Sequence, residues 1–508
     1  MKILEAVIEM GSTGIRLTIC EIDSLGTWTI VDKSDMPISL GRDVFTSGYI
    51  HRDTLLQCLR ILAGFKEQVE GWGIALQDVK IIATSAMREA KNRDTVADRI
   101  LIKTGRSVTV IDGIEENRLM YVAVREVLRR DFPQRQNKNS LMLEIGGGST
   151  EIMLLEKGKI ATAHSLRLGT VIIDQYIKSM GGSRNDAKRF LEDFIKTAGV
   201  NLNIGIDMQK IHQFITIGND MQLVASHVGT KVGDRTWLIV RENFLAFVDK
   251  VEQYSVEECV AKFHISYFEA QYLPVSLLTY KLFLELTPAQ EIIVSNTTIR
   301  EGLLISKFSK KTKSQEDFSA QILAAALNIG RRYRIDEAHA LYVKTMALKI
   351  YNHLWDDLGL EPDSKLLLEI AALLHDIGTF IRSGDHHLHS QYIILHTDIF
   401  GLTKNQIKII ALITGYHRGA MTLPDDDLFH SLSRAERMCV LKLAAILRIA
   451  DALDRGHSQR IPDITVLQGA ETLTLDTNGI HDIKPEKQAV AEKGDLFEAV
   501  FGYTVLIV

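Results

Sequence analysis

Short apolar runs alternate with amphipathic stretches along the first 130 residues. The runs have the length of strands, and the stretches between them carry apolar residues three and four positions apart, as helices do. The expected strands span residues 3–10, 15–22, 28–33, 80–86 and 107–112. The expected helices span residues 53–70, 92–104 and 115–130. This alternation predicts an α/β domain.

The pattern restarts after a charged loop, RRDFPQRQNKNS, at residues 129–140. Residues 141–155, LMLEIGGGSTEIMLL, repeat the arrangement that opens the chain: a strand, an acidic residue, a glycine-rich turn and a second strand. The segments IEMGSTGIRLTI (8–19) and LEIGGGSTEIML (143–154) can be superposed with a carboxylate, a glycine and hydroxyl groups in matching places. We therefore expect two related α/β halves, each presenting one polar hairpin to a common cleft.

The character of the chain changes after residue 303. The polar segment 306–319 is expected to be a linker, and the residues after it carry helical periodicity. The expected helices are 319–333, 336–358, 363–380, 387–396, 404–416 and 434–453. Residues 464–508 return to strand-like alternation around a charged middle. The second part of the chain is therefore predicted to be a helical domain with a small α+β appendage.

Composition narrows the class of protein. With 508 residues the chain should form two to four domains, and its 46% hydrophobic and 24% charged residues are typical of globular proteins. A net charge of −5 argues against a general nucleic-acid coat. No signal peptide or membrane-length apolar stretch is evident, and the four cysteines are isolated. These features predict a cytoplasmic protein with reduced thiols that binds neither membranes nor nucleic acid.

The two glycine-rich hairpins have the chemistry of a phosphate site. Glycines let backbone N–H groups approach an anion closely, and hydroxyl groups add further donors. Nearby carboxylates would repel a bare phosphate, but they fit if Mg²⁺ lies between them and the phosphate oxygens. The candidate donors are Gly11, Ser12, Thr13, Gly146, Gly147, Gly148, Ser149 and Thr150, and the candidate metal ligands are Glu9, Glu144 and Glu151. Neither a Walker A loop nor a Rossmann glycine motif is present. A plain tight turn is the alternative for either hairpin alone.

Four motifs in order carry a more specific signal: EMGSTGIRL (9–17), TSAMREA (84–90), IDGIEENRLMY (111–121) and LEIGGGSTE (143–151). Together they resemble the exopolyphosphatase and guanosine pentaphosphate phosphohydrolase family. The resemblance implies two actin-like (ribonuclease H-like) α/β domains, at residues 1–125 and 126–305. A helical domain at 315–460 and a small α+β subdomain at 461–508 would follow.

The resemblance also implies an activity and roles for individual residues. Terminal phosphate is released from inorganic polyphosphate or guanosine pentaphosphate, with Mg²⁺ or Mn²⁺ in the cleft between the α/β domains. Glu116 matches the glutamate that activates water, as a general base. Arg88 matches an arginine that contacts phosphate. The family commonly forms homodimers, so a homodimer is expected.

The chain departs from the family pattern in three respects. Glu9 and Glu144 stand where aspartate is usual, and the added methylene moves each carboxylate outward by about 1.5 Å. Thr13 stands where asparagine is typical, and ITIGND (215–220) lacks the expected Gly-Gly-Thr turn. The departures leave open whether the site is retuned or disabled, and we expect retained activity because Glu116, Arg88 and GGGSTE remain.

The helical part has its own candidate chemistry, because ten of the sixteen histidines lie between residues 339 and 457. His339, His375, Asp376 and Asp451, in that order, resemble the metal ligands of the HD phosphohydrolase superfamily. This resemblance implies an HD-type helical domain and a second divalent metal, although a vacant inherited site is a serious alternative. For His386, His387, His389 and His417 we expect partly exposed loop and helix-end positions, with a second metal site as the alternative.

Other functions remain open at this stage. The helical domain could be the catalytic part, regulated by a front half that binds polyphosphate or an alarmone. The whole chain could instead be a sensor without catalysis. A polyphosphate enzyme should have a basic channel, and the candidates for it are Arg129, Arg130, Arg135, Lys138, Arg331, Arg332 and Arg334.

Overall fold

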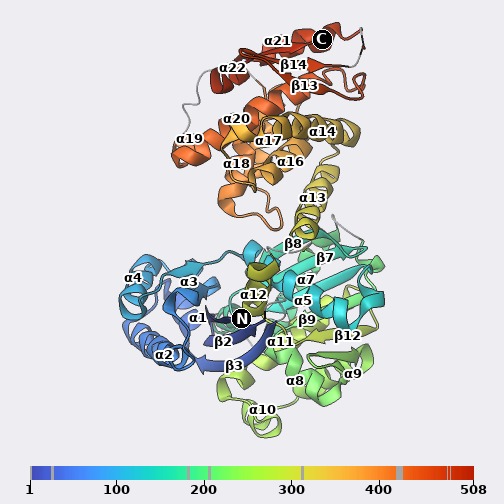
Figure 1. Cartoon of the computed structure of the whole chain (residues 1–508). Helices are drawn as coiled ribbons and strands as arrows, with labels where there is room; N and C mark the ends of the chain where they lie inside the picture. The colour runs from blue at the N-terminus through green and yellow to red at the C-terminus, as the bar shows by residue number, and fades with distance from the viewer. Residues whose placement is uncertain are drawn as a thin grey trace. The chain divides into compact units, whose positions relative to one another are not determined.

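The computed structural model describes residues 3–23, 28–179, 184–203, 207–309, 314–418, 427–477, 479–480 and 482–508. The chain divides into two compact units, residues 1–317 and 318–508 (Figure 1). Among the described helices, none is long and apolar enough to cross a lipid bilayer. The predicted domain boundaries within each unit remain predictions.

The first sheet of the first unit has five strands in the order β3-β2-β1-β4-β5. β1 pairs antiparallel with β2 and parallel with β4, so a hairpin meander leads into a parallel half. Its strands are β1 (Ile3–Met10), β2 (Gly14–Ile22), β3 (Trp28–Pro37), β4 (Val79–Ala83) and β5 (Val108–Val110). The first three agree closely with the expected strands, whereas the fourth ends at Ala83 and gives way to helix α3 (Ser85–Glu89).

The second sheet has seven strands in the order β10-β11-β12-β9-β6-β7-β8. Its strands are β6 (Ser140–Ile145), β7 (Thr150–Glu156), β8 (Lys159–Leu166), β9 (Gln213–Ile217), β10 (Thr230–Gly233), β11 (Thr236–Val240) and β12 (Glu291–Ser295). The five strands β8-β7-β6-β9-β12 repeat the order and directions of the first sheet, since β6 is antiparallel to β7 and parallel to β9. The expected repeat of a strand-turn-strand unit is therefore a repeat of the whole sheet topology.

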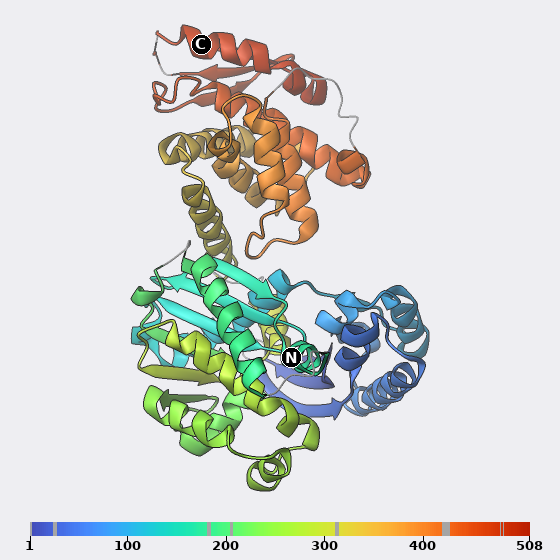
Figure 2. The same ribbon diagram turned by 180° about the vertical axis from the view of Figure 1, so that it is seen from behind.

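Helices cover both faces of the first sheet. Alternate residues of β1 face opposite sides, as the period of a strand requires. Ile8 packs with Leu62 of α2 on one face, while Val7 packs with Leu119 of α5 on the other. The first six helices of this unit are α1 (Leu40–Ser47), α2 (Arg52–Gly71), α3, α4 (Arg93–Thr104), α5 (Gly113–Asp131) and α6 (Thr170–Ser179). The next six are α7 (Arg184–Asn203), α8 (Asn219–Val228), α9 (Arg241–Val251), α10 (Val256–Phe263), α11 (Tyr267–Glu285) and α12 (Ile299–Ser309). Seen from behind, green helices lie across the strands of the second sheet (Figure 2).

Helix α5 connects the two sheets. It packs on the first sheet through Leu119 and contacts β7 and β8 of the second sheet. Helix α12 crosses α5 at Gly302, where an added Cβ would lie 2.0 Å from the carbonyl oxygen of Leu119. The absence of a side chain at Gly302 thus permits a close crossing, which brings Arg300 toward the first sheet.

The second unit is helical with one small sheet. Its sheet has the order β13-β14-β15, from β13 (Thr465–Gln468), β14 (Thr472–Asp476) and β15 (Thr504–Ile507). Its helices are α13 (Ser314–Arg332, which begins before the unit boundary), α14 (Glu337–His353), α15 (Trp355–Leu358), α16 (Ser364–Leu374), α17 (His386–Leu395), α18 (Lys404–Gly415), α19 (Asp427–His430), α20 (Arg434–Ala452), α21 (Lys484–Lys493) and α22 (Asp495–Phe501).

The boundary between the two units, at residues 317–318, lies within the segment 306–319 that was expected to be a linker. The described residues on both sides of 310–313 are helical, because α12 runs to Ser309 and α13 starts at Ser314. One sequence-based expectation about this unit is wrong. The helix expected at 363–380 ends at Leu374, and a short 3-10 helix, Ile377–Phe380, follows. The break lies at His375 and Asp376, where Gly378 approaches the backbone of α17 so closely that an added Cβ would lie 2.1 Å from the carbonyl oxygen of His386.

Candidate active site

The two predicted hairpins have the same backbone geometry. In the first, the amide of Gly11 donates to the carbonyl of Gly14 at 2.9 Å. In the second, the amide of Gly146 donates to the carbonyl of Ser149 at 2.8 Å. The next-to-last pair of each ladder before the turn places Glu9 opposite Arg16 and Glu144 opposite Glu151.

The next helix in the chain fixes the carbonyl groups of each turn. The carbonyl of Ser12 accepts from Gly41 at 2.8 Å, at the start of α1. The carbonyls of Gly146 and Gly147 accept from Thr170 and Val171, at the start of α6, at 3.0 and 2.9 Å. By contrast, within the described residues, no protein acceptor receives the amides of the turn residues Ser12, Thr13, Gly147, Gly148 and Ser149. Both turns therefore keep free N–H donors, as a backbone anion site requires.

The glycines of the second hairpin allow the two turns to meet. A Cβ added at Gly147 would lie 3.0 Å from Ser12 Cβ and 3.0 Å from Thr13 Cγ2 of the first turn. A Cβ added at Gly148 would lie 2.4 Å from Phe45 Cζ and 2.6 Å from Ser85 Oγ. The triplet thus serves the approach of one hairpin to the other, which is a reason for its composition besides ligand binding.

Helix α5 delivers Glu116 to this place. Asp112 caps the helix by accepting from the amide of Glu115 at 2.9 Å, so Glu116 lies in the first turn. The adjacent Glu115 faces away and forms a bidentate pair with Arg118 at 2.6 and 2.7 Å. Glu116 is 6% exposed and shares a hydrogen bond with Glu151. The two adjacent glutamates therefore have different surroundings.

Arg88 holds Glu116 rather than facing the cavity. Both terminal nitrogens of its guanidinium lie 3.3 Å from Glu116 Oε2, and one also donates to the carbonyl of Ile111 at 2.7 Å. Burial and the neighbouring charge of Glu151 raise the pKa of Glu116 well above its ordinary value, although Arg88 lowers it. These surroundings favour the protonated form of Glu116.

Glu144 and Glu9 have different environments. Within the described residues, the Glu144 carboxylate has no hydrogen bond or ion pair to protein. Its burial and the charges of Glu9 and Glu116 raise its pKa to about 8. Glu9, in contrast, is paired with the buried Arg300, and Arg16 lies 3.7 Å from its other oxygen. The two glutamates that replace the family's aspartates are thus not equivalent.

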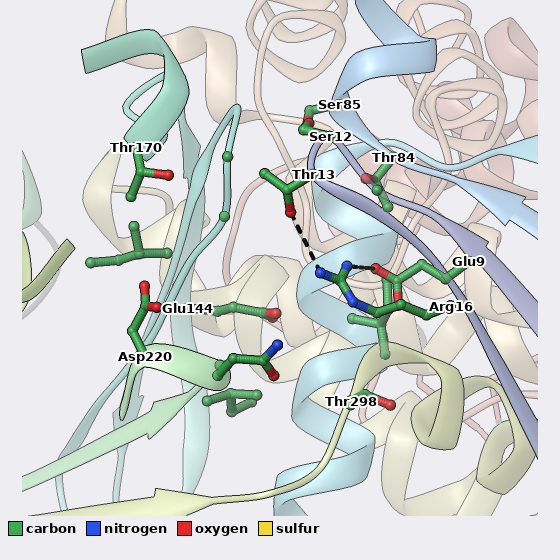
Figure 3. A pocket seen from close by; sticks show the side chains of 18 of the residues that line it. Glu9, Ser12, Thr13, Arg16, Thr84, Ser85, Glu144, Thr170, Asp220 and Thr298 are labelled. Atoms are coloured by element: carbon green, nitrogen blue, oxygen red, sulfur yellow. Dashed lines mark hydrogen bonds and ion pairs between the residues drawn. The ribbon is translucent and has the colours of Figure 1, made fainter. Parts of the chain in front are cut away.

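These groups line a cavity of about 450 Å³. Figure 3 shows Glu9 and Arg16 on one side of it and Glu144 and Asp220 on the other. The predicted site residues in its lining are Glu9, Gly11, Ser12, Thr13, Glu116, Glu144, Gly146, Gly147, Ser149 and Glu151. Arg88, Gly148 and Thr150 are not in the lining. Thr150 is buried, and its hydroxyl donates to the carbonyl of Leu168 at 2.5 Å, so its role is structural.

Sequence reasoning missed part of the lining. Nothing in the sequence pointed to Arg16 or Arg300. Arg300 matters because it pairs with Glu9, which is 291 positions away in the sequence. The segment ITIGND also lines the cavity, through Gly218, which has φ +115°, and the following Asp220. Sequence reasoning also missed the part of the lining that comes from α11. There the rings of Phe268 and Tyr272 meet edge to face, with centroids 5.0 Å apart.

The carboxylates suit a divalent cation. Glu144 is unpartnered, and Glu151 accepts from Ser165 at 2.7 Å and from Asn117 at 2.8 Å with lone pairs to spare. Burial raises the pKa of Glu151 to about 7, against the lowering effect of the Ser165 hydrogen bond. Buried carboxylates that lie near one another need a positive charge to compensate them. Mg²⁺ can supply it, because this ion prefers oxygen ligands. Glu9 fits less well, because Arg300 already neutralises it.

The second unit brings together the other predicted ligands. His339 Nε2 lies 3.2 Å from His375 Nε2 and 3.4 Å from Asp451 Oδ1. Asp376 Oδ1 lies 3.7 Å from His375 Nε2. The expectation of exposed positions for His386 and His417 is wrong: the two residues are 6% and 0% exposed, and both face Asp376.

Known proteins resemble the chain over almost its full length. A protein of Photobacterium profundum named guanosine-5'-triphosphate,3'-diphosphate pyrophosphatase is 24% identical over 487 residues, which cover 93% of this chain and 91% of that protein. One of the same name from Vibrio cholerae is 25% identical over 492 residues, with coverage of 93% and 92%.

Solved structures agree with the fold of the first unit. An exopolyphosphatase from Cytophaga hutchinsonii gives a TM-score of 0.54 at 22% identity, over 61% of this chain and 98% of that one. The Aquifex aeolicus member of the Ppx/GppA family gives 0.50 at 22% identity, over 61% and 99%. These similarities support the actin-like fold.

Sequence models of the family give the assignment. The model of the Ppx/GppA phosphatase family matches residues 18–311, and that of domain III of these phosphatases matches residues 323–483. The first match alone spans more than half of the chain. The protein is therefore a hydrolase that belongs to the Ppx/GppA phosphatase family.

Proposed function

We propose that the protein removes the terminal phosphate of guanosine pentaphosphate, with inorganic polyphosphate as the weaker substrate. The observation that supports this most strongly is the pairing of two turns with free amides around one carboxylate cluster that includes Glu116. The turns supply donors for phosphate oxygens, and Glu116 lies beside them on a separate helix. Positioning and charge neutralisation are the main requirements of phosphoryl transfer.

A divalent cation would be held by Glu144 and Glu151. When bound, Mg²⁺ or Mn²⁺ supplies positive charge that neutralises the phosphate oxygens as charge develops. Glu9 keeps Arg16 and Arg300 in place instead, so the extra methylene of this glutamate serves a salt bridge.

Glu116 acts as the general base in this proposal. Arg88 orients its carboxylate, and positive charge at Glu144 and Glu151 would lower its raised pKa so that it can accept a proton. The carboxylate takes a proton from a water molecule as the water oxygen bonds to the terminal phosphorus. The phosphoanhydride P–O bond to that phosphorus breaks, and its electron pair leaves on the bridging oxygen of the shortened chain. Ser12, whose hydroxyl lies 2.9 Å from that of Ser85, helps to hold the first turn against helix α3.

Charge in the cavity favours a nucleotide over a long polyanion. Two guanidinium groups of the described residues line it, and both already have carboxylate partners: Arg300 pairs with Glu9, and Arg16 pairs with Asp35 at 2.9 Å. Seven carboxyl groups line it, from Glu9, Asp35, Glu116, Glu144, Glu151, Asp220 and Glu269. A polyphosphate chain carries negative charge along its whole length, whereas the nucleotide, besides its 5' and 3' phosphates, has an uncharged guanine base that can contact the Phe268 and Tyr272 rings.

The proposed basic channel also finds little support. Arg129 pairs with Glu126 at 2.8 Å, and Arg135 pairs with Glu291 at 2.8 Å. Arg331 pairs with Glu337 at 2.7 Å. Arginines that already have carboxylate partners are poorer anchors for polyphosphate.

Phosphate release from guanosine pentaphosphate and from polyphosphate, with Mg²⁺ or Mn²⁺, tests the proposal. Glu116→Gln should reduce kcat by about 10²–10⁴-fold, the usual contribution of a general base. Glu115→Gln is the matched control and should stay within a few-fold of the wild type, since Glu115 pairs only with Arg118. A Glu116→Gln variant as active as the control would overturn the role of Glu116. A faster rate on polyphosphate would overturn the substrate preference.

A further inference from the structure

The part of the cavity that helix α11 lines differs in chemistry from the two turns. It is formed by Phe268, Glu269 and Tyr272, and we call these three residues the α11 wall. The Tyr272 side chain is buried and that of Phe268 is half-buried, and their rings meet edge to face. The turns with free amides thus share one cavity with a surface made of aromatic rings and a carboxylate.

The charges at the α11 wall disfavour phosphate groups there. Burial raises the pKa of Asp220, and the nearby charge of Glu269 raises it further, so these two carboxyl groups are neighbours. The arginines in the described cavity lining, Arg16 and Arg300, already have carboxylate partners. A phosphate at the wall would therefore face negative charge, whereas a ligand group that donates hydrogen bonds would be favoured.

Glu269 has one carboxylate oxygen that the fold uses and one that it does not use. Its Oε2 completes the capping box of α11, because it accepts from the amide of Ser266 at 2.9 Å and from the Ser266 hydroxyl at 2.8 Å. Within the described residues, Oε1 accepts no hydrogen bond and forms no ion pair. Since the capping bonds fix the carboxylate, Oε1 is a positioned acceptor on the cavity wall.

A purely structural role for Glu269 is the alternative, and the neighbouring helix shows what that role requires. Helix α10 begins with the same capping box, formed by Ser255 and Glu258. Glu258 is not in the cavity lining, so a capping glutamate needs no ligand beside it. Glu269 differs because its second oxygen stands next to the two rings of the α11 wall.

Guanine and adenine present different edges to such an acceptor. The Watson–Crick edge of guanine carries two adjacent donors, N1–H and the N2 amino group, whereas N1 of adenine is an acceptor. A carboxylate oxygen can only accept, so it attracts the edge of guanine and repels N1 of adenine. Hypoxanthine keeps N1–H but lacks the amino group. All three bases can stack on aromatic rings.

We propose that Glu269 selects guanine, with Oε1 accepting from N1–H and from the N2 amino group while the base packs on the rings of Phe268 and Tyr272. Glu269 is then a specificity-determining residue that takes no part in phosphoryl transfer. This inference rests on the proposed function, because a nucleotide whose terminal phosphate lies at the turns must place its base elsewhere in the same cavity. The cavity volume of about 450 Å³ lies within the usual range for ligand sites.

Glutamine at position 269 tests the proposal without removing the cap. A capping box accepts glutamine as well as glutamate, so Glu269→Gln should keep the start of α11. Its amide oxygen must face Ser266 to preserve the capping bonds, which turns the NH₂ group toward the cavity. This group would repel N1–H of guanine and donate to N1 of adenine. Glu258→Gln, the same change in the capping box of α10, is the matched control.

Calorimetric titration of the full-length protein with GTP, ITP or ATP, in the presence of Mg²⁺, measures the selection. The Glu116→Gln variant serves as the parent, so that hydrolysis does not interfere. The parent should bind GTP about 10-fold or more tightly than ATP, with ITP between them. Adding Glu269→Gln should abolish this preference, and adding Glu258→Gln should leave it unchanged. Adding Phe268→Leu should weaken all three nucleotides by a similar factor of about 5–10, because stacking tolerates any base.

Three results would overturn the inference: equal affinities of the parent for GTP and ATP, no measurable binding of GTP, or an unchanged preference in Glu269→Gln. A preference altered by Phe268→Leu would contradict the packing of the base on that ring. Phosphate release from guanosine pentaphosphate by the wild type, measured separately, distinguishes this inference from the proposed function. Release without a preference for guanine would overturn only the role of Glu269, whereas a preference that depends on Glu269 without release would overturn only the proposed function.

Discussion

Replacing Glu144 with glutamine should stabilise the protein at alkaline pH while abolishing its stabilisation by Mg²⁺. Burial and the charges of Glu9 and Glu116 raise the pKa of Glu144 from 4.5 to about 8 in the folded state. A raised carboxyl pKa means that the folded state binds the proton more tightly than the unfolded state. The contribution of Glu144 to wild-type stability is therefore fully present below pH 4.5 and is lost as pH rises toward 8.

The size of the effect follows from that interval. At about 1.4 kcal/mol per pH unit, ionising Glu144 costs at most about 5 kcal/mol over the full window, and about 3.4 kcal/mol between pH 5.5 and 8. Water in the cavity screens part of this charge, so we expect about 1.5–2 kcal/mol over the narrower range. Glutamine keeps the shape of the protonated acid and does not ionise, so the variant should gain this amount over the wild type at pH 8.5.

Urea unfolding followed by tryptophan fluorescence can measure the difference. Three of the four tryptophans, Trp28, Trp72 and Trp237, belong to the first unit, so the signal reports mainly on it. Mg²⁺ should stabilise the wild type more at pH 8.5 than at pH 5.5, and should leave Glu144→Gln unaffected. A stability difference that does not vary with pH, or an equal gain from Mg²⁺ in both proteins, would refute the reasoning.

Two further predictions concern the packing of the site. Gly148→Ala should destabilise the first unit by about 1–3 kcal/mol in urea unfolding and lower kcat, because the added methyl meets Phe45 and Ser85; unchanged stability would contradict the close approach of the turns. Arg300→Met should cost about 3–5 kcal/mol by leaving Glu9 buried with only a distant partner. Adding Glu9→Gln should recover part of that loss, and additive effects of the two changes would contradict their pairing.

The sequence predicted the hairpins well because their signals are local. Strand, acidic residue, glycines and hydroxyls lie within about ten consecutive positions, and the register that sets Glu144 opposite Glu151 follows from the turn itself. The repeat of the motif also anticipated the repeated strand order of the two sheets. The position of Glu116 beside the second hairpin could not be read from pattern alone, and it came from resemblance.

What sequence reasoning missed depends on tertiary contacts. Glu9 looked like a metal ligand because Arg300, its partner, is 291 positions away and reaches it only through the crossing of α12 over α5. His386 and His417 looked like surface histidines because nothing in their neighbourhoods shows that α16 ends at Leu374 and directs Asp376 toward them. The polar segment 306–319 contains the boundary between the two units, as a linker should, but its composition did not show that the residues on both sides of 310–313 are helical.

The central claim is that the two turns together bind a metal-bridged phosphate next to Glu116. Calorimetric titration of the protein with guanosine pentaphosphate in the presence of Mg²⁺ tests it directly. The two proteins to compare are the Glu116→Gln variant, which should bind without turnover, and the same variant carrying Gly147→Val. The account predicts tight binding to the first and at least a 100-fold weaker Kd for the second, since the valine would occupy the space between the turns at Ser12 and Thr13. Equal affinity of the two proteins would contradict the claim.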